Sequence, residues 1–145
     1  MGQLSFPPSA RVYLDTAPFI YSVEKHVDYW SMLKGLWRSV QANDLAVVTS
    51  ELTLLETLVQ PIRENNQTLI EAYQTLLTKT EVVFFPITTE LLRASADLRA
   101  LHKFKTPDAI HAATALTSGC GFLVTNDDVF RRLANIEVVL LGEFV

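Results

Sequence analysis

The sequence contains one cysteine, five glycines and no long apolar run, and each scarcity narrows the class of protein. The lone Cys120 excludes an internal disulfide and is compatible with a reducing cytoplasm, although a small core residue is the simpler interpretation. No segment approaches the ~20 apolar residues of a membrane span, and the N-terminus lacks the basic and apolar regions of a signal peptide. We therefore expect a cytoplasmic protein that has no membrane partner.

Two further features are missing from the chain. No glycine-rich, phosphate-cradling loop follows the first expected strand, which argues against a dinucleotide or nucleoside-triphosphate site. No strong basic stripe is present either, because 12 Lys and Arg stand against 16 Asp and Glu, a net charge of −4. Tight non-specific binding to long duplexes is therefore not expected.

The bulk composition is that of an ordinary globular protein. With 145 residues, 49% apolar and 19% charged, the chain is large enough to bury a core without disulfides or metal staples. It has no internal repeat and no low-complexity linker. We expect a single domain over residues 1–145, with residues 1–10 as a loosely held arm.

Short apolar segments alternate with segments of helical periodicity. Strands are expected at 11–15, 45–49, 81–87, 121–125 and 137–141. Helices are expected at 17–26, 28–42, 51–58, 64–79, 89–102, 106–119 and, as a short piece, 126–134. The strands are continuously apolar, as in a parallel sheet covered on both faces. The predicted fold is a three-layer α/β/α arrangement around a mainly parallel sheet of four to five strands.

Several helix boundaries carry local signals. Ser50 is expected to cap the helix that starts at Glu51, and Pro61 to stop that helix. Thr106, Pro107 and Asp108 together predict a strong helix start, with a hydroxyl cap, a proline in the first position and an acid in the first turn.

Four acidic residues stand where a predicted strand ends or near a predicted helix start: Asp15, Glu56, Asp108 and Asp127. A parallel sheet could gather them at one edge, where ligand sites of such sheets are found. Carboxylates about 5 Å apart repel by ~3 kcal/mol per pair at an effective dielectric of about 20. Such a cluster calls for a cation, and hard oxygen ligands select Mg²⁺ or Mn²⁺. This pattern indicates metal-dependent phosphodiester chemistry.

No single acid decides this interpretation. Taken alone, Asp108 is more often a first-turn partner of the helix dipole, and Asp15 could be a turn former. Glu56 is harder to dismiss, because apolar residues surround it and a buried acid needs a partner.

The joint pattern resembles a known family. In order, the segments VYLDTAPFIY, TSELTLLETLVQP, TPDAIHAATAL and LVTNDDVF resemble the four signature segments of the PIN-domain nucleases, over residues 11–130. Within that family the chain is similar to the compact VapC-like toxins of VapBC-type toxin–antitoxin pairs, which are ribonucleases.

The resemblance implies roles for the matching positions. The four acids would hold one or two Mg²⁺ or Mn²⁺ ions and support hydrolysis of RNA by an activated water, leaving a 5′-phosphate. Thr16 and Thr125 would orient the ligands, and Asn126 would tie the fourth segment in place. Two departures stand out: Ala17 replaces a frequent Asn or Ser, and Asp128 doubles the fourth acid, where the motif favours Asp127.

Substrate and partner contacts are less specific. Lys103 and Lys105 precede Asp108 at the same rim, and His111 lies one helical turn beyond it. All three could contact RNA, although solvated lysines and a histidine bonded to its own backbone are the simpler interpretations.

The implied partners are an RNA substrate, a small antitoxin and a second copy of the chain. The aromatic residues of the early helices suit a partner groove or a homodimer face: Tyr21, Tyr29, Trp30 and Trp37.

Three alternatives remain beside the toxin interpretation. One is an RNA-processing PIN nuclease without an antitoxin. Another is a non-catalytic binding module on the same scaffold, which the presence of all four acids disfavours. The third is a haloacid-dehalogenase-type phosphatase, which is disfavoured because Ala17 stands where that chemistry needs a second acid.

Overall fold

One parallel sheet organises the protein. The computed structural model describes residues 3–145; residues 1 and 2 of the expected N-terminal arm lie outside the described residues. The sheet has five strands in the order β3-β2-β1-β4-β5. They are β1 (Ala10–Leu14), β2 (Leu45–Ser50), β3 (Val83–Phe85), β4 (Phe122–Thr125) and β5 (Glu137–Leu140). The predicted α/β class is confirmed, and every pairing in the sheet is parallel.

The central strand β1 pairs with β2 on one side and β4 on the other, with Tyr13 beside Val48 and Leu123. Because all strands run the same way, their carboxyl ends share one edge of the sheet. The chain segments that follow β1, β2 and β4 therefore begin next to one another.

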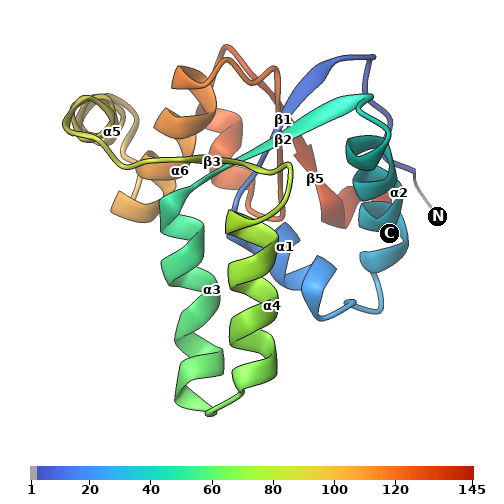
Figure 1. Ribbon diagram of the computed structural model, residues 1–145. Helices are drawn as coiled ribbons and strands as arrows, with labels where there is room; N and C mark the ends of the chain where they lie inside the picture. The colour runs from blue at the N-terminus through green and yellow to red at the C-terminus, as the bar shows by residue number, and fades with distance from the viewer. Residues whose placement is uncertain (1–2) are drawn as a thin grey trace.

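Helices cover both faces of the sheet (Figure 1). They are α1 (Thr16–Val23), α2 (Trp30–Gln41), α3 (Glu51–Arg63), α4 (Gln67–Thr78), α5 (Thr89–His102) and α6 (Thr106–Thr117), with short 3₁₀ helices η1 (Asp128–Arg132) and η2 (Leu141–Phe144). One apolar cluster packs α1, α2 and α4 on the sheet, and a second packs α6 on the opposite face. A third joins α5 to α6. These clusters form the predicted three layers.

The side chains of β1 divide between these layers. Val12 and Leu14 belong to the cluster under α1 and α2, whereas Tyr13 points to the α6 side. Successive strand residues face opposite sides, so a strand covered on both faces is apolar throughout.

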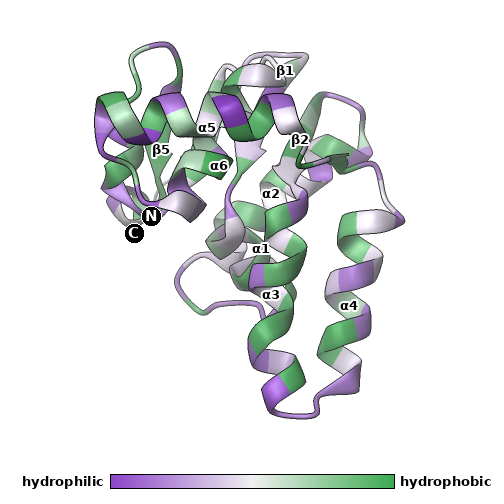
Figure 2. Ribbon diagram, turned by 90° about the vertical axis from the view of Figure 1, so that its left-hand side faces the viewer, coloured by the Kyte–Doolittle hydropathy of each residue, from purple (hydrophilic) through white to green (hydrophobic). Residues whose placement is uncertain are grey.

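Helices α3 and α4 lie side by side and project from the sheet as a hairpin (Figures 1 and 2). The prediction that Pro61 stops α3 is wrong, because the helix continues to Arg63. A proline removes only its own N–H from the ladder, and the amides of Glu64 and Asn66 still reach the carbonyls of Gln60 and Pro61.

Other boundaries differ by smaller amounts. The predicted helix at 126–134 is the shorter 3₁₀ helix η1. Thr106 lies inside α6, and Lys105 takes the cap position without a side-chain cap bond. The cap of α3 is as predicted, since the Ser50 hydroxyl accepts from the Leu52 amide at 3.0 Å. Gly119 follows α6 with φ of +76°, a left-handed conformation that favours glycine.

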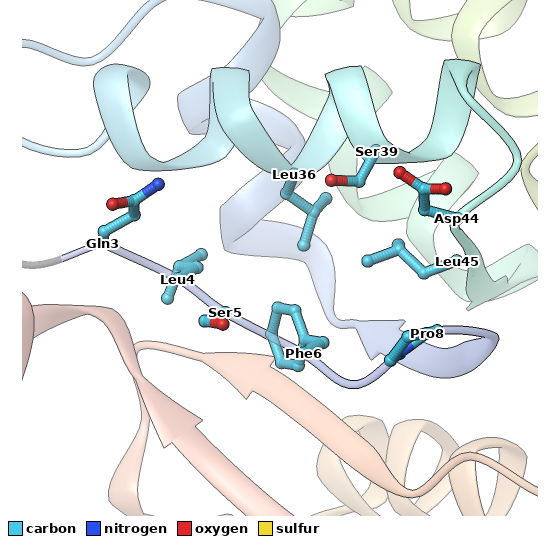
Figure 3. A pocket seen from close by; sticks show the side chains of 9 residues that line it. All are labelled: Gln3, Leu4, Ser5, Phe6, Pro8, Leu36, Ser39, Asp44 and Leu45. Atoms are coloured by element: carbon cyan, nitrogen blue, oxygen red, sulfur yellow. The ribbon is translucent and has the colours of Figure 1, made fainter.

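The N-terminal segment crosses α2 at the end of the sheet where the strands begin. Leu4 and Phe6 pack against the core there, and whether residues 1–10 are loosely held stays a prediction. A pocket of about 420 Å³ lies between this segment and α2 (Figure 3). It is lined by Gln3, Leu4, Ser5, Phe6, Pro8, Leu36, Ser39, Asp44 and Leu45. None of these is a predicted site residue. Within residues 3–145 no helix is long and apolar enough to cross a membrane.

Candidate active site

The carboxyl ends of β1 and β4 place the first and fourth acids together. Asp15 directly follows β1, and Asp127 lies two residues beyond β4. The register sets Leu14 beside Val124, so Asp15 lies next to Thr125. The Thr125 hydroxyl donates to Asp15 Oδ2 at 2.6 Å, and also accepts from the Asp127 amide at 3.0 Å. Thr125 thus ties the two acidic segments to each other.

Asp15 is buried in an electrostatically demanding position. It is 8% exposed, and its Oδ1 has no hydrogen-bond partner among the described residues 3–145. Burial raises the pKa of its carboxyl from 3.8 to about 6; His111 and the Thr125 hydroxyl oppose the rise, and the charges of Asp127 and Glu56 add to it. A buried oxygen without a partner is rare and points to a missing ligand.

Glu56 reaches the same edge from α3. Its Oε1 accepts from the Thr16 hydroxyl at 2.6 Å and lies 2.8 Å from His111 Nε2. Burial acts to raise the pKa of the Glu56 carboxyl, but the hydrogen bonds from His111 and Thr16 outweigh it and leave the pKa below its ordinary value. Glu56 therefore carries its negative charge in a fixed orientation.

Asp108 and Asp127 complete the group. Asp108 is half-buried and lies in the first turn of α6. Burial is the largest cause that raises the pKa of its carboxyl, and the charges of Asp127 and Glu56 raise it further. Asp127 caps η1, since its Oδ1 accepts from the Val129 amide at 3.0 Å. The charges of Asp127 and Glu56 act on both Asp15 and Asp108, so the fold brings all four acids to one edge.

The donor set suits a hard divalent cation. The four acids supply only carboxylate oxygens, which are the ligands that hard cations prefer. The buried Oδ1 of Asp15, unpartnered among residues 3–145, is the oxygen that a positive charge would stabilise most. Within residues 3–145, no group of three His, Cys, Asp or Glu side chains is already arranged so that it could hold a metal ion. Hydrogen bonds from the protein orient Asp15, Glu56 and Asp127. The donor set fits a hard cation such as Mg²⁺ or Mn²⁺ in its chemistry, because it consists of carboxylate oxygens.

The chain matches the family model of the PIN domain over residues 12–136. It belongs to the PIN domain family. No curated protein matches its sequence.

Solved structures share the fold at low identity. VapC20 of Mycobacterium tuberculosis, described as a Sarcin-Ricin loop cleaving toxin, is 21% identical with a TM-score of 0.72, over 88% of this chain and 98% of that chain. The VapBC2 structure from Rickettsia felis, bound to a promoter DNA fragment, has 20% sequence identity and a TM-score of 0.67. The match covers 90% of this chain and 98% of that chain. The structure of VapBC-1 from nontypeable Haemophilus influenzae has 18% sequence identity and a TM-score of 0.67, and the match covers 91% of this chain and 98% of that chain. At these identities the likeness shows the fold.

The polar residues predicted around the acids of this PIN domain lie beside them. Thr16 contacts Glu56, and Thr125 contacts Asp15. The Asn126 amide donates to the hydroxyls of Tyr21 and Tyr29 at 3.2 Å each, and its Oδ1 accepts from the Gly142 amide at 3.0 Å. Asn126 therefore fastens the segment after β4 to α1 and to the C-terminal turn.

The positions of Asp127 and Asp128 indicate which of the two belongs to the acidic group. Asp127 acts on the carboxyls of Asp15 and Asp108, as their raised pKa values show. Both acids are exposed, but Asp128 acts on a different group. Its charge helps to raise the pKa of the Arg131 guanidinium, with a smaller effect than the hydrogen bond to Glu143. These contacts favour Asp127 as the fourth acid.

The expected substrate contact of His111 does not fit its position. The side chain is 3% exposed, and its two ring nitrogens lie within hydrogen-bond distance of Tyr13 and Glu56. A histidine buried this way is not offered to RNA. Lys103 and Lys105 are exposed, and the positive charge of Lys105 acts to lower the pKa of Asp108. A role of the two lysines in binding RNA stays a prediction.

The flanking arginines are held by the protein itself. Arg131 forms a two-pronged pair with Glu143 at 3.0 and 2.5 Å. Arg132 donates to the backbone carbonyls of His102 and Lys103, which fixes the loop before α6.

One residue near the site was not predicted. Tyr13 lies two positions before Asp15, and its hydroxyl is 2.6 Å from His111 Nδ1. A signal was present, because a tyrosine in an otherwise aliphatic buried strand needs a hydrogen-bond partner for its hydroxyl.

Proposed function

We propose that the protein is a metal-dependent endoribonuclease that acts in the cytoplasm as the toxin of a toxin–antitoxin pair. The observation that carries the proposal is the buried oxygen of Asp15, unpartnered among residues 3–145, with the charges of Glu56 and Asp127 acting on both Asp15 and Asp108. Its membership of the PIN family and its structural likeness to proteins of VapBC complexes support the same reading.

Each acid has a definable role in this proposal. Asp15, Glu56, Asp108 and Asp127 would hold Mg²⁺ or Mn²⁺, whose charge supports attack of water on a phosphodiester. Thr125 and Thr16 fix one oxygen each of Asp15 and Glu56, which leaves the other oxygen of each carboxylate for the cation. Lys103 and Lys105 would neutralise RNA phosphates at the rim.

The test compares RNA cleavage by the wild type and by Asp15→Ala, each with Mn²⁺ and with a chelator. We expect cleavage only by the wild type with Mn²⁺. Equal cleavage in all four reactions would contradict the proposal. A single-stranded DNA of the same sequence, assayed in parallel, tests the preference for RNA.

An apolar pocket supports the antitoxin as a partner. It measures about 200 Å³, lies between α1, α2 and α4, and is lined by Ser22, Val23, Trp30, Trp37 and Leu76. Such a pocket suits the apolar side chains of a protein segment. A short gene beside this one, whose product co-purifies with the protein and blocks cleavage, would separate a toxin from an RNA-processing nuclease.

Helix α3 supports self-association, because it carries large apolar residues on its exposed side as well as on the side that packs against the core. Its buried residues include two threonines and a proline: Thr53, Thr57 and Pro61. Its outer side carries large apolar residues: Leu55, 61% exposed, Val59, and Ile62, 56% exposed. Figure 2 shows hydrophobic positions along this projecting helix. A row at this spacing is an unpartnered helical face.

The charges at the two ends of α3 favour a second copy as the occupant. Antiparallel pairing about a two-fold axis at the level of residue 57 sets Leu55 against Val59 of the second copy. The same register sets Glu51 against Arg63, of opposite charge. A self-complementary patch is what an isologous dimer requires. We therefore propose a homodimer through α3.

A further inference from the structure

A chain of hydrogen bonds links the buried core to Glu56. Tyr13 on β1 is fully buried, and its hydroxyl oxygen lies 2.6 Å from Nδ1 of His111 on α6. Across the imidazole ring, Nε2 lies 2.8 Å from Glu56 Oε1 on α3. Three elements far apart in the sequence thus meet through one histidine.

The contacts of Tyr13 determine which nitrogen of His111 carries the proton. Among residues 3–145, the Tyr13 hydroxyl has one hydrogen-bond partner, His111 Nδ1. The neighbouring Thr49 hydroxyl donates instead to the Leu14 carbonyl, at 2.8 Å. A phenol is protonated at neutral pH, so the single Tyr13 proton is directed to His111 Nδ1.

A neutral imidazole with an accepting Nδ1 carries its hydrogen on Nε2. That hydrogen points to Glu56 Oε1 at 2.8 Å, which is nearer to Nε2 than the Thr16 hydroxyl oxygen at 3.3 Å. The same Oε1 also accepts from the Thr16 hydroxyl at 2.6 Å. Two donors therefore fix one oxygen of the carboxylate. The other oxygen, Oε2, has no hydrogen-bond partner within residues 3–145.

We propose that Tyr13 is a positioning residue that selects the Nε2–H tautomer of His111 and thereby holds Glu56 with Oε2 available to a divalent cation. The inference rests on the proposed metal-dependent function. Without the Tyr13 hydroxyl, Nδ1 loses its donor and the ring can take the Nδ1–H tautomer. The Nε2 lone pair then faces the Glu56 carboxylate and repels it, so the carboxylate is no longer oriented.

The first experiment reads the tautomer in the metal-free protein. Two-bond ¹H–¹⁵N correlation spectra of ¹⁵N-histidine-labelled protein at neutral pH distinguish Nε2–H from Nδ1–H imidazole. We expect His111 as the Nε2–H form in the wild type, and a smaller population of that form in Tyr13→Phe. An Nδ1–H or doubly protonated His111 in the wild type would overturn the proposal.

The second experiment measures Mn²⁺ affinity by titration calorimetry. Groups that orient a metal ligand typically change affinity 10- to 100-fold, and we expect about tenfold weaker binding by Tyr13→Phe. Tyr73→Phe is the matched control, because Tyr73 is also fully buried and its hydroxyl donates to an acid, Glu24, outside the site. We expect this control to bind as the wild type does. Unchanged affinity in a folded Tyr13→Phe variant would overturn the proposal.

Substitutions of His111 provide a comparison that does not depend on the folding of Tyr13→Phe. His111→Gln supplies one acceptor and one donor without charge, and we expect its Mn²⁺ affinity to stay within about threefold of the wild type. His111→Leu supplies neither, and we expect about tenfold weaker binding or more. Equal Mn²⁺ affinity of these two variants would overturn the proposal that His111 transmits the effect of Tyr13 to Glu56. Failure of the wild type to bind Mn²⁺ would instead contradict the proposed function, and the tautomer spectra would still test the hydrogen-bond chain.

Discussion

At the scale of single residues, the central feature of the site is the carboxylate of Asp15, whose negative charge is unfavourable in its buried position. One of its oxygens accepts a hydrogen bond from Thr125, and the other has no partner in the part of the chain that the structure describes. Leaving a buried polar atom unpaired costs free energy, and a protein that keeps such an atom usually gains a ligand or an activity by it. In this PIN domain the residue that directly follows β1 therefore leaves one buried oxygen for the proposed cation.

The burial of Asp15 predicts that the stability of the metal-free protein depends on pH. The folded-state pKa of Asp15 is raised from 3.8 to about 6, so its contribution to stability is fully present below about pH 4 and is lost as pH rises through 6. A shift of about two units corresponds to roughly 3 kcal/mol. We expect the free energy of unfolding of Asp15→Asn, minus that of the wild type, to rise by up to this amount between pH 4 and pH 7.

Urea unfolding in the presence of a chelator measures this difference. The comparison between the two proteins removes contributions of other titrating groups. A difference that stays constant from pH 4 to pH 7 would show that Asp15 is not desolvated in the folded protein.

The positions of the acids and the threonines beside them could be predicted from the sequence, whereas the contacts of Tyr13 and His111 could not. An acid directly after an apolar strand must lie at the carboxyl edge of a parallel sheet, which places Asp15 and Asp127. The Tyr13–His111–Glu56 chain depends on contacts between residues up to 98 positions apart. Such contacts follow from strand order and helix placement, which periodicity does not specify.

At the scale of elements, α3 combines a site residue with an apolar outer face. Glu56 is adjacent in the chain to Leu55, so the proposed dimer surface borders the acidic edge. The sequence predicted the start of α3 through the Ser50 cap, because capping is local chemistry. Its end was mispredicted, because a buried proline near a helix terminus costs only one ladder bond and is tolerated when it packs.

Substitutions on α3 test the proposed homodimer. We expect Leu55→Glu combined with Ile62→Glu to convert a dimer to a monomer, since the change places four like charges in the centre of an apolar interface. Analytical ultracentrifugation at micromolar concentration measures the change. Leu101→Glu is the control, because Leu101 is 76% exposed on α5 and belongs to no such row.

Two outcomes would contradict the assignment of this face. A wild-type protein that sediments as a monomer would remove the homodimer itself. A double variant that stays dimeric would place the interface elsewhere on the molecule, as would loss of the dimer in Leu101→Glu.

At the scale of the whole molecule, the charge balance depends on the site. Setting aside the four clustered acids leaves 12 acidic and 12 basic residues, since 16 − 4 = 12. A bound cation would therefore leave a protein with little net repulsion toward phosphate. The α/β class was predictable from alternating apolar and helical segments, whereas the order β3-β2-β1-β4-β5 was not, because several orders satisfy the same pattern.

Manganese-dependent thermal stability tests whether the four acids share one cation. At about 100 times the dissociation constant, a ligand that binds only the folded state stabilises it by about 2.7 kcal/mol, or roughly 5–10 °C in Tm for a chain of this size. We expect this rise for the wild type and for the control Asp128→Asn. We expect most of it to vanish in Asp15→Asn, Glu56→Gln, Asp108→Asn and Asp127→Asn, each measured alone. A full rise in any two of those four variants would mean that these carboxylates do not converge on a common ion.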